Sequence, residues 1–165
     1  MPWDDALRRG VTAPSLDTTV RALDNLLDIV YQHLDLHSDR YADARLKRRP
    51  WTRREAFGHL IDYCVAHQRW VTRAITDSKL AAPAYPAEDA AAVRHYSEHP
   101  WVDTVKLWVS ANRLLLHTLS RIPEGKTQVR CRIGIAPPVP LADLVQAYAA
   151  HCDDIAGQVL SMLFR

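Results

Sequence analysis

Two segments of the sequence carry a histidine followed three residues later by an aspartate. These pairs are His59 with Asp62 and His151 with Asp154. On a helix, this spacing places both side chains on one side, with their Cβ atoms about 5–6 Å apart. Imidazole and carboxylate groups suit Zn, Ni, Fe or Mn, and a catalytic site leaves a coordination position open for water. The four residues are a candidate metal site if the segments meet. The alternative is that His151 is a core histidine that donates to a tyrosine or a carboxylate.

The first of these segments is predicted to be a long helix over residues 51–75. Thr52 and Glu55 have the spacing of a capping box, and Trp51 precedes the cap, where it can pack back on the helix. Residues that recur at steps of four, three and four share one face of this helix: His59, Tyr63, Ala66 and Trp70. We therefore expect His59 to point into the interior of the protein.

Three further amphipathic segments predict a bundle of four helices. The first starts after Ser15, the third at Trp101 and the last near Pro140, with His151 on its apolar face. The link from Lys79 to Pro100 is longer than two adjacent antiparallel helices need, so we expect a crossover that makes the second and third helices run in the same direction. Residues 129–133 alternate with period two before the last helix, and we interpret this lone segment as extended cover over the end of the bundle.

The composition indicates one compact all-α domain over residues 1–165. Apolar residues make up 48% of the chain and there are only 5 glycines. The net charge of +2 gives no electrostatic support for nucleic-acid binding. A locally basic run precedes and enters the second helix, and we interpret it as solvated: Arg45, Lys47, Arg48, Arg49, Arg53 and Arg54.

The cysteines and the ends of the chain favour a cytoplasmic protein. Cys64, Cys131 and Cys152 are odd in number and lack the spacing of a tight pair, which fits free, buried thiols in a reducing compartment. We find no signal peptide and no membrane span in the sequence.

Other side chains are candidates to line a pocket near His59. Aromatic residues at helical spacing are typical of a core as well as of a pocket, and His67 either lines the edge of the same cavity or reaches solvent. Asn112 interrupts an apolar seam, so its amide either hydrogen-bonds across the bundle or contacts a ligand. The candidate pocket residues are Tyr63, His67, Trp70, Asn112, Tyr148 and Ile155.

The sequence resembles the DinB/YfiT-like superfamily. The resemblance rests on WTRREAFGHLIDYCVAHQRWVTRAI for the second helix, LWVSANRLLLHTLSRIP for the third and PLADLVQAYAAHCDDIAGQVL for the last. It implies a four-helix bundle with a long link between helices 2 and 3, often dimeric. It also implies a divalent metal held by three histidines, one on the second helix and two on the last. Relatives of this kind include small-thiol-dependent transferases and isomerases and proposed metal-dependent hydrolases.

The metal ligands of this superfamily carry over only in part. The resemblance places the ligand of the second helix on His59 and the first ligand of the last helix on His151, while the third falls on Ile155. Isoleucine has no lone pair, so two imidazoles would hold Zn or Ni more weakly unless Asp154 or Asp62 supplies an oxygen.

Two functions follow from this departure. The first is a metal-dependent hydrolase or small-thiol-dependent transferase with an altered His/Asp site. The second is a non-catalytic bundle with a decayed metal site, which serves as a small-ligand-binding or dimerisation module. No catalytic residue is assigned.

Overall fold

Four long helices form the body of the protein in the computed structural model, which describes residues 15–34 and 37–161. They are α2 (Leu16–Leu34), α4 (Arg53–Asp77), α6 (Trp101–Leu119) and α7 (Leu141–Leu160). The predicted all-α four-helix bundle is confirmed. The described helices share one continuous hydrophobic core, in which Phe57 meets the rings of Trp101 and Trp108 edge-on at 5.2 Å between centroids.

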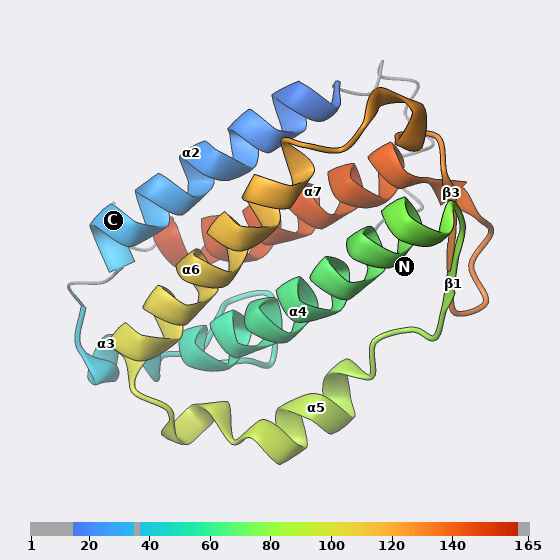
Figure 1. The fold of residues 1–165 in the computed structure, drawn as a ribbon. Helices are drawn as coiled ribbons and strands as arrows, with labels where there is room; N and C mark the ends of the chain where they lie inside the picture. The colour runs from blue at the N-terminus through green and yellow to red at the C-terminus, as the bar shows by residue number, and fades with distance from the viewer. Residues whose placement is uncertain (1–14, 35–36, 162–165) are drawn as a thin grey trace.

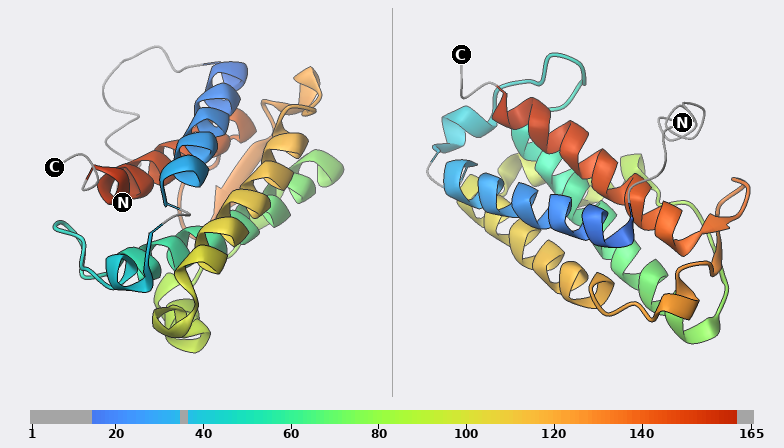
Figure 2. Two further views of the ribbon diagram at one scale, coloured as in Figure 1. Left: turned by 90° about the vertical axis from the view of Figure 1, so that its left-hand side faces the viewer. Right: turned by 90° about the horizontal axis from the view of Figure 1, so that it is seen from above.

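The helices run in two parallel pairs. In Figures 1 and 2, α4 and α6 lie side by side and run in one direction, while α2 and α7 run in the opposite direction. A parallel pair that is consecutive in the bundle needs a connection that returns along its whole length. The predicted crossover between the second and third long helices is therefore present.

The crossover contains three short elements. They are β1 (Leu80–Ala82), α5 (Ala87–Arg94) and the 3-10 turn η1 (Tyr96–Glu98). The helix α5 lies along the outside of α4 (Figure 1), and none of its residues, all of which are described, is buried. The crossover thus contacts α4 through β1, α5 and η1, and α5 lies on the surface.

The extended segment before α7 is part of a small sheet. The strand β2 (Arg130–Ile133) pairs in parallel with β1 and antiparallel with β3 (Val139–Pro140). The extended segment was predicted correctly, but the interpretation of it as a lone cover was wrong. Its partner β1 has only three residues, too few to show a period of two.

The interpretation of the basic run as solvated was wrong for Arg53 and Arg54. These side chains are only 6% and 4% exposed. The short helix α3 (Asp39–Ala42) explains why, because Arg54 pairs with Asp39 at 2.7 Å and with Asp43 at 2.8 Å. The guanidinium of Arg53 lies 3.9 Å from the centre of the Tyr41 ring. Partners that are distant in sequence allow these charges to be buried.

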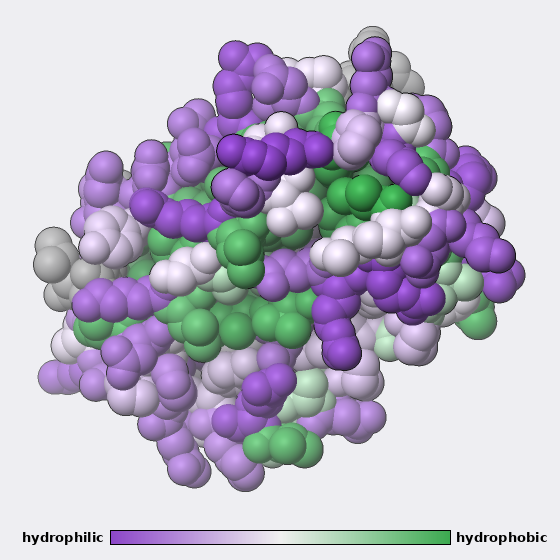
Figure 3. All heavy atoms as spheres, viewed as in Figure 1, coloured by the Kyte–Doolittle hydropathy of each residue, from purple (hydrophilic) through white to green (hydrophobic). Residues whose placement is uncertain are grey.

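The surface is polar with apolar patches. Figure 3 shows hydrophobic residues between polar ones on the face that α4 and α6 share. Among the described residues, Val65 of α4 and Leu107 and Leu114 of α6 are large hydrophobic residues that are exposed. The 3-10 turn η2 (Glu124–Lys126) completes the described elements. None of the described helices has the length and apolar character needed to cross a membrane.

A glycine of α4 fixes the position of the crossover. A Cβ atom on Gly58 would lie 2.2 Å from Cγ of Tyr96, so the phenol ring rests directly on the helix backbone. From this position, the Tyr96 hydroxyl donates to Oδ1 of Asp62 at 2.9 Å, one helical turn further along α4. The absence of a side chain at Gly58 is therefore what lets η1 pack against α4.

We expect Gly58→Ala to destabilise the protein by about 1–3 kcal/mol, because the ring of Tyr96 must move away from α4. Urea unfolding measures this change. Gly157→Ala in α7 is the matched control, since a Cβ there meets nothing within 4 Å. The control should raise stability by roughly 0.5–1 kcal/mol through helix propensity. Equal effects of the two substitutions would contradict this account of Gly58.

Candidate functional site

The start of α4 holds His59 in place. Thr52 caps the helix in the predicted capping box, accepting from the backbone N–H of Glu55 while the Glu55 carboxylate accepts from that of Thr52. Trp51 packs back on the helix as expected, and its ring stacks on His59 with 4.8 Å between centroids. One side of the His59 ring is therefore covered by an aromatic surface.

The two histidines that were predicted to be metal ligands lie side by side. Nε2 of His59 on α4 and Nε2 of His151 on α7 are 2.9 Å apart, and the rings meet edge to face. Both residues are partly buried. If both rings are neutral, one Nε2 carries the proton and donates to the other.

The third position of the expected metal site is occupied by hydrocarbon. Ile155 lies one turn beyond His151 on α7 and is 0% exposed. Its neighbour Asp154 is exposed, and its carboxylate accepts from Arg49 at 2.8 Å and from Gln158 at 3.1 Å. Asp154 is thus paired with a cation at the surface.

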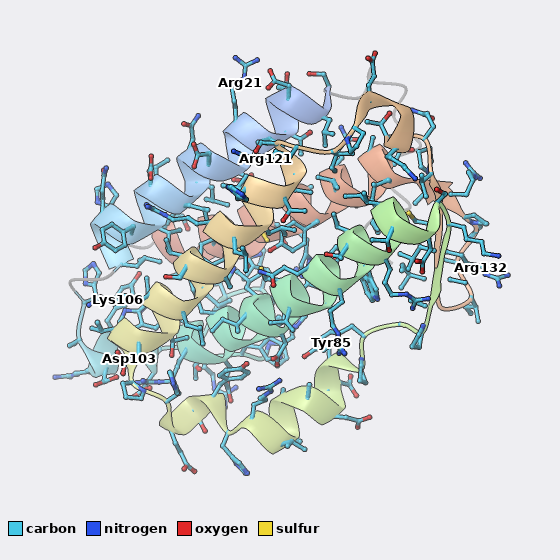
Figure 4. The ribbon with its side chains drawn as sticks, viewed as in Figure 1. Arg21, Tyr85, Asp103, Lys106, Arg121 and Arg132 are labelled. Atoms are coloured by element: carbon cyan, nitrogen blue, oxygen red, sulfur yellow. The ribbon has the colours of Figure 1, made fainter. Side chains whose placement is uncertain are left out.

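Asp62 is engaged by the crossover. It is 4% exposed, accepts from Tyr96, and lies 3.4 Å from Nε of Arg94. Its second oxygen, Oδ2, and the hydroxyl of Tyr85 are buried and have no hydrogen-bond partner among the described residues. Tyr85 lies on the crossover beside α4 (Figure 4). The partners of Asp62 therefore come from the crossover and not from α7.

As a result, residues 15–34 and 37–161 contain no group of three His, Cys, Asp or Glu side chains placed to hold a metal ion. The structure brings His59 and His151 together, and it gives Asp154 and Asp62 other partners.

Most of the candidate pocket residues form an aromatic cluster next to the histidine pair. The Tyr63 ring lies 4.6 Å from that of His151 and 5.4 Å from that of Tyr148, and His67 is 4.7 Å from Trp70. His67, which was predicted to line a cavity edge or reach solvent, is 2% exposed. The gap beside His67 and Tyr148 has no room for a water molecule. The cluster is therefore packed.

Asn112 is satisfied across the bundle. Its Oδ1 accepts from the Tyr148 hydroxyl at 2.5 Å, and its Nδ2 donates to the carbonyl of Trp108 at 2.9 Å. The buried amide thereby links α6 to Tyr148 of α7, which lies three residues before His151.

The arrangement of the elements matches two solved structures. YfiT from Bacillus subtilis, a probable metal-dependent hydrolase with an unusual four-helix bundle topology, superimposes with a TM-score of 0.77 at 14% identity, over 93% of this chain and 89% of that one. The mycothiol-dependent maleylpyruvate isomerase gives a TM-score of 0.74 at 13% identity, over 88% of this chain and 61% of that one. This chain has the DinB/YfiT-like fold.

The comparisons establish the fold alone. The chain spans about three fifths of the isomerase, at 61% of its length. No protein-family model and no curated protein matches the sequence significantly. The chemistry of this DinB/YfiT-like bundle must therefore be argued from its own side chains.

The histidine pair is neutral at pH 7. Burial and the nearby Arg49 guanidinium lower the pKa of His59 to about 4. Burial, His59 and Arg49 do the same for His151, whose pKa is also about 4. Two neutral imidazoles can accept or share protons, and the positive charge beside them comes from Arg49.

The buried thiols are inert. Cys64, Cys131 and Cys152 are free and buried, as predicted. Burial raises the pKa of Cys64 to about 11, so the nucleophilic thiolate is scarce at neutral pH.

The sequence reasoning missed two contributors to this site. Arg49 was assigned to a solvated run, and Tyr96 was not considered. The available signal for Arg49 was its position two residues before Trp51, because Trp51 was expected to pack on the helix that carries His59. No local signal points to Tyr96, which reaches Asp62 through the crossover.

Stability should fall in acid partly because of His67. Burial lowers the pKa of His67 to about 3, while a histidine in an unfolded chain has a pKa of about 6.5. Between about pH 6.5 and pH 3, the unfolded chain binds this proton while the folded chain does not. The contribution of His67 to the free energy of unfolding is therefore fully present above this window, and it is lost as the pH falls through it. Nδ1 of His67 lies 2.8 Å from the carbonyl oxygen of Tyr63, so His67→Asn keeps a donor there without the titration.

We expect His67→Asn to reduce the slope of unfolding free energy against pH by up to about 1.4 kcal/mol per pH unit within this window. Urea unfolding at a series of pH values measures the slope. The variant also loses ring packing and is less stable throughout, so the slope is the decisive readout. Parallel curves for the variant and the wild type would contradict the assignment.

Proposed function

We propose that this chain is a small-ligand-binding DinB/YfiT-like bundle in which the His59–His151 pair has replaced a three-ligand metal centre. The observation that carries this proposal is the complete burial of Ile155, one turn beyond His151, where the DinB/YfiT pattern has its third histidine. An apolar side chain cannot donate to a metal, and it excludes water from the buried side of the histidine pair.

The donor set fits a divalent metal only in part. Two nitrogens bound to one metal at about 2.05 Å are about 2.9 Å apart at the right angles of an octahedral or square-planar ion such as Ni²⁺, and about 3.3 Å apart in a tetrahedral zinc site. The separation of 2.9 Å between the Nε2 atoms therefore suits two adjacent ligands. The remaining positions do not fit, because no third His, Cys, Asp or Glu side chain of the described residues is placed with this pair. Asp154 is exposed and accepts from Arg49 and Gln158, and Asp62 accepts from Tyr96.

The local charge also disfavours a cation. The Arg49 guanidinium lowers the pKa of both histidines, which means that its positive field reaches both rings. The same field would repel a divalent ion bound between them. An uncharged or anionic small molecule suits this environment better.

A metal-dependent enzyme is the second candidate, and the separation of the two Nε2 atoms favours it. In that case His59 and His151 would hold the ion, with water or substrate in the other positions. A bound Zn, Ni, Fe or Mn ion supplies Lewis acidity, which lowers the pKa of a bound water or thiol. The two similar proteins of known structure, a probable metal-dependent hydrolase and a mycothiol-dependent isomerase, support a hydrolase or a small-thiol-dependent reaction as the chemistry to test.

Several expectations from the sequence stay predictions. They are a homodimer, a cytoplasmic location, a thiol partner and a single domain over residues 1–165. Light scattering of the purified chain measures the first of these.

The proposal predicts that Ile155→His alone tightens binding of Ni²⁺ or Zn²⁺ by about 100-fold, which corresponds to the roughly 3 kcal/mol that each ligand contributes in a four-ligand zinc site. Calorimetric titration of metal-free protein measures the affinity, and a rise in melting temperature with added metal provides a second readout.

Two variants complete this experiment. Ile155→Leu keeps the hydrocarbon and should leave metal affinity as in the wild type. His59→Ala in the Ile155→His background should remove most of the gain. The proposal is wrong if the wild type already holds about one divalent ion per chain tightly and Ile155→His gains nothing.

A further inference from the structure

Arg49 is held beside the histidine pair by a stack of planar groups. Its guanidinium carbon lies 5.4 Å from the centre of the Trp51 ring, and that ring in turn stacks on His59. The Arg49 side chain is only 25% exposed. A cation fixed in this way is pre-organised, because little side-chain freedom remains to be lost when it binds something.

Only half of the binding edge of this guanidinium is used. Nη2 donates to Oδ2 of Asp154 at 2.8 Å, while Nε is buried and has no hydrogen-bond partner among the described residues. The Nε–H and one Nη2–H of arginine point in the same direction and match the two oxygens of a carboxylate. Asp154 therefore makes a one-point contact at an edge that suits a two-point contact.

Asp154 can leave this contact easily. Its side chain is 53% exposed, and its other oxygen, Oδ1, already accepts from Gln158 at 3.1 Å. When Oδ2 turns to water, the carboxylate stays solvated and keeps Gln158. The Nε–H of Arg49 has no comparable alternative, because it makes no hydrogen bond with the described residues even while Asp154 is in place.

We propose that Arg49 binds a carboxylate group of a small-molecule ligand through Nε and Nη2, in place of Asp154, and thereby holds the ligand beside His59 and His151. The inference rests on the proposed function, since it names the chemical class of the ligand for the same site. A ligand carboxylate would satisfy the buried Nε–H that Asp154 leaves without a partner.

The chemistry of the surroundings selects this class. The two imidazoles are uncharged, so Arg49 places an unpaired positive charge beside them once Asp154 has moved away. The edge already accommodates the planar carboxylate of Asp154. The rest of the ligand would then lie toward the imidazoles, which can donate or accept one hydrogen bond between them.

The test uses full-length protein that has been stripped of metal and dialysed free of chelator, since common chelators are themselves polycarboxylates. The probes are acetate, pyruvate and succinate, with acetamide and succinamide as uncharged analogues and inorganic phosphate as a tetrahedral anion. Binding is followed by NMR through the imidazole resonances of His59 and His151, at constant ionic strength and at about pH 7.5.

We expect at least one carboxylate to shift these resonances with millimolar affinity, while its amide does not. Arg49→Lys keeps the charge but loses the paired donors, and should weaken binding roughly tenfold. Asp154→Asn removes the charged competitor and should tighten binding several-fold. Asp17→Asn is the matched control, because Asp17 is an exposed partner of Arg21 on α2, and it should have no effect.

The proposal is overturned if none of the carboxylates binds to Asp154→Asn, if phosphate binds more tightly than every carboxylate, or if Asp17→Asn tightens binding as much as Asp154→Asn. Circular dichroism confirms that each variant is folded. The failure of this proposal is distinguishable from that of the proposed function, because the latter shows itself as tight metal binding by the wild type in the absence of any carboxylate.

Discussion

The contact between two partly buried imidazoles at the interface of α4 and α7 sets the chemistry of the whole site. Nitrogens 2.9 Å apart cannot both carry a positive charge, and burial opposes the first protonation as well as the second. The pair is therefore neutral, with one proton between the two Nε2 atoms. Charge at this site has to come from elsewhere, and the structure supplies it through Arg49, which the aromatic ring of Trp51 holds at the rim.

Ile155 gives this pair its present character. Ile155 is fully buried one turn beyond His151, so hydrocarbon occupies the position at which the proposed metal centre would have a third imidazole. Tyr63, Tyr148 and His67 continue the packed layer beneath it. A ligand would therefore meet the pair from the partly exposed sides of His59 and His151. The aspartates do not add a third ligand to the pair, because Asp154 accepts from Arg49 and Gln158, and Asp62 accepts from Tyr96 on the crossover.

The parts of the structure that depend on local pattern could be predicted from the sequence. The capping box of Thr52 and Glu55 and the steps of three and four residues gave α4 and the face that carries His59, and the length of the link gave the crossover. The parts that depend on contacts distant in sequence could not. Arg54 is buried because α3 brings two carboxylates to it, and β2 has a partner because three residues after α4 happen to be extended. The resemblance identified Ile155 as the residue at the third ligand position. The spacing of three residues from histidine to aspartate did not reveal that Asp62 and Asp154 have partners other than the histidine pair.

The pair of Arg49 and Asp154 shows how a protein can keep a binding residue ready without leaving it exposed. An ion pair between half-exposed groups contributes about 0–1 kcal/mol, whereas a two-point charged hydrogen bond contributes about 1.5–3 kcal/mol or more. The internal carboxylate is thus strong enough to orient the guanidinium and weak enough to be displaced. Asp154 also lies on the same helix as His151, one residue short of a full turn away. Displacing it would leave the backbone of α7 and the imidazole contact unchanged, so a ligand could enter at the rim without disturbing the pair that it must meet.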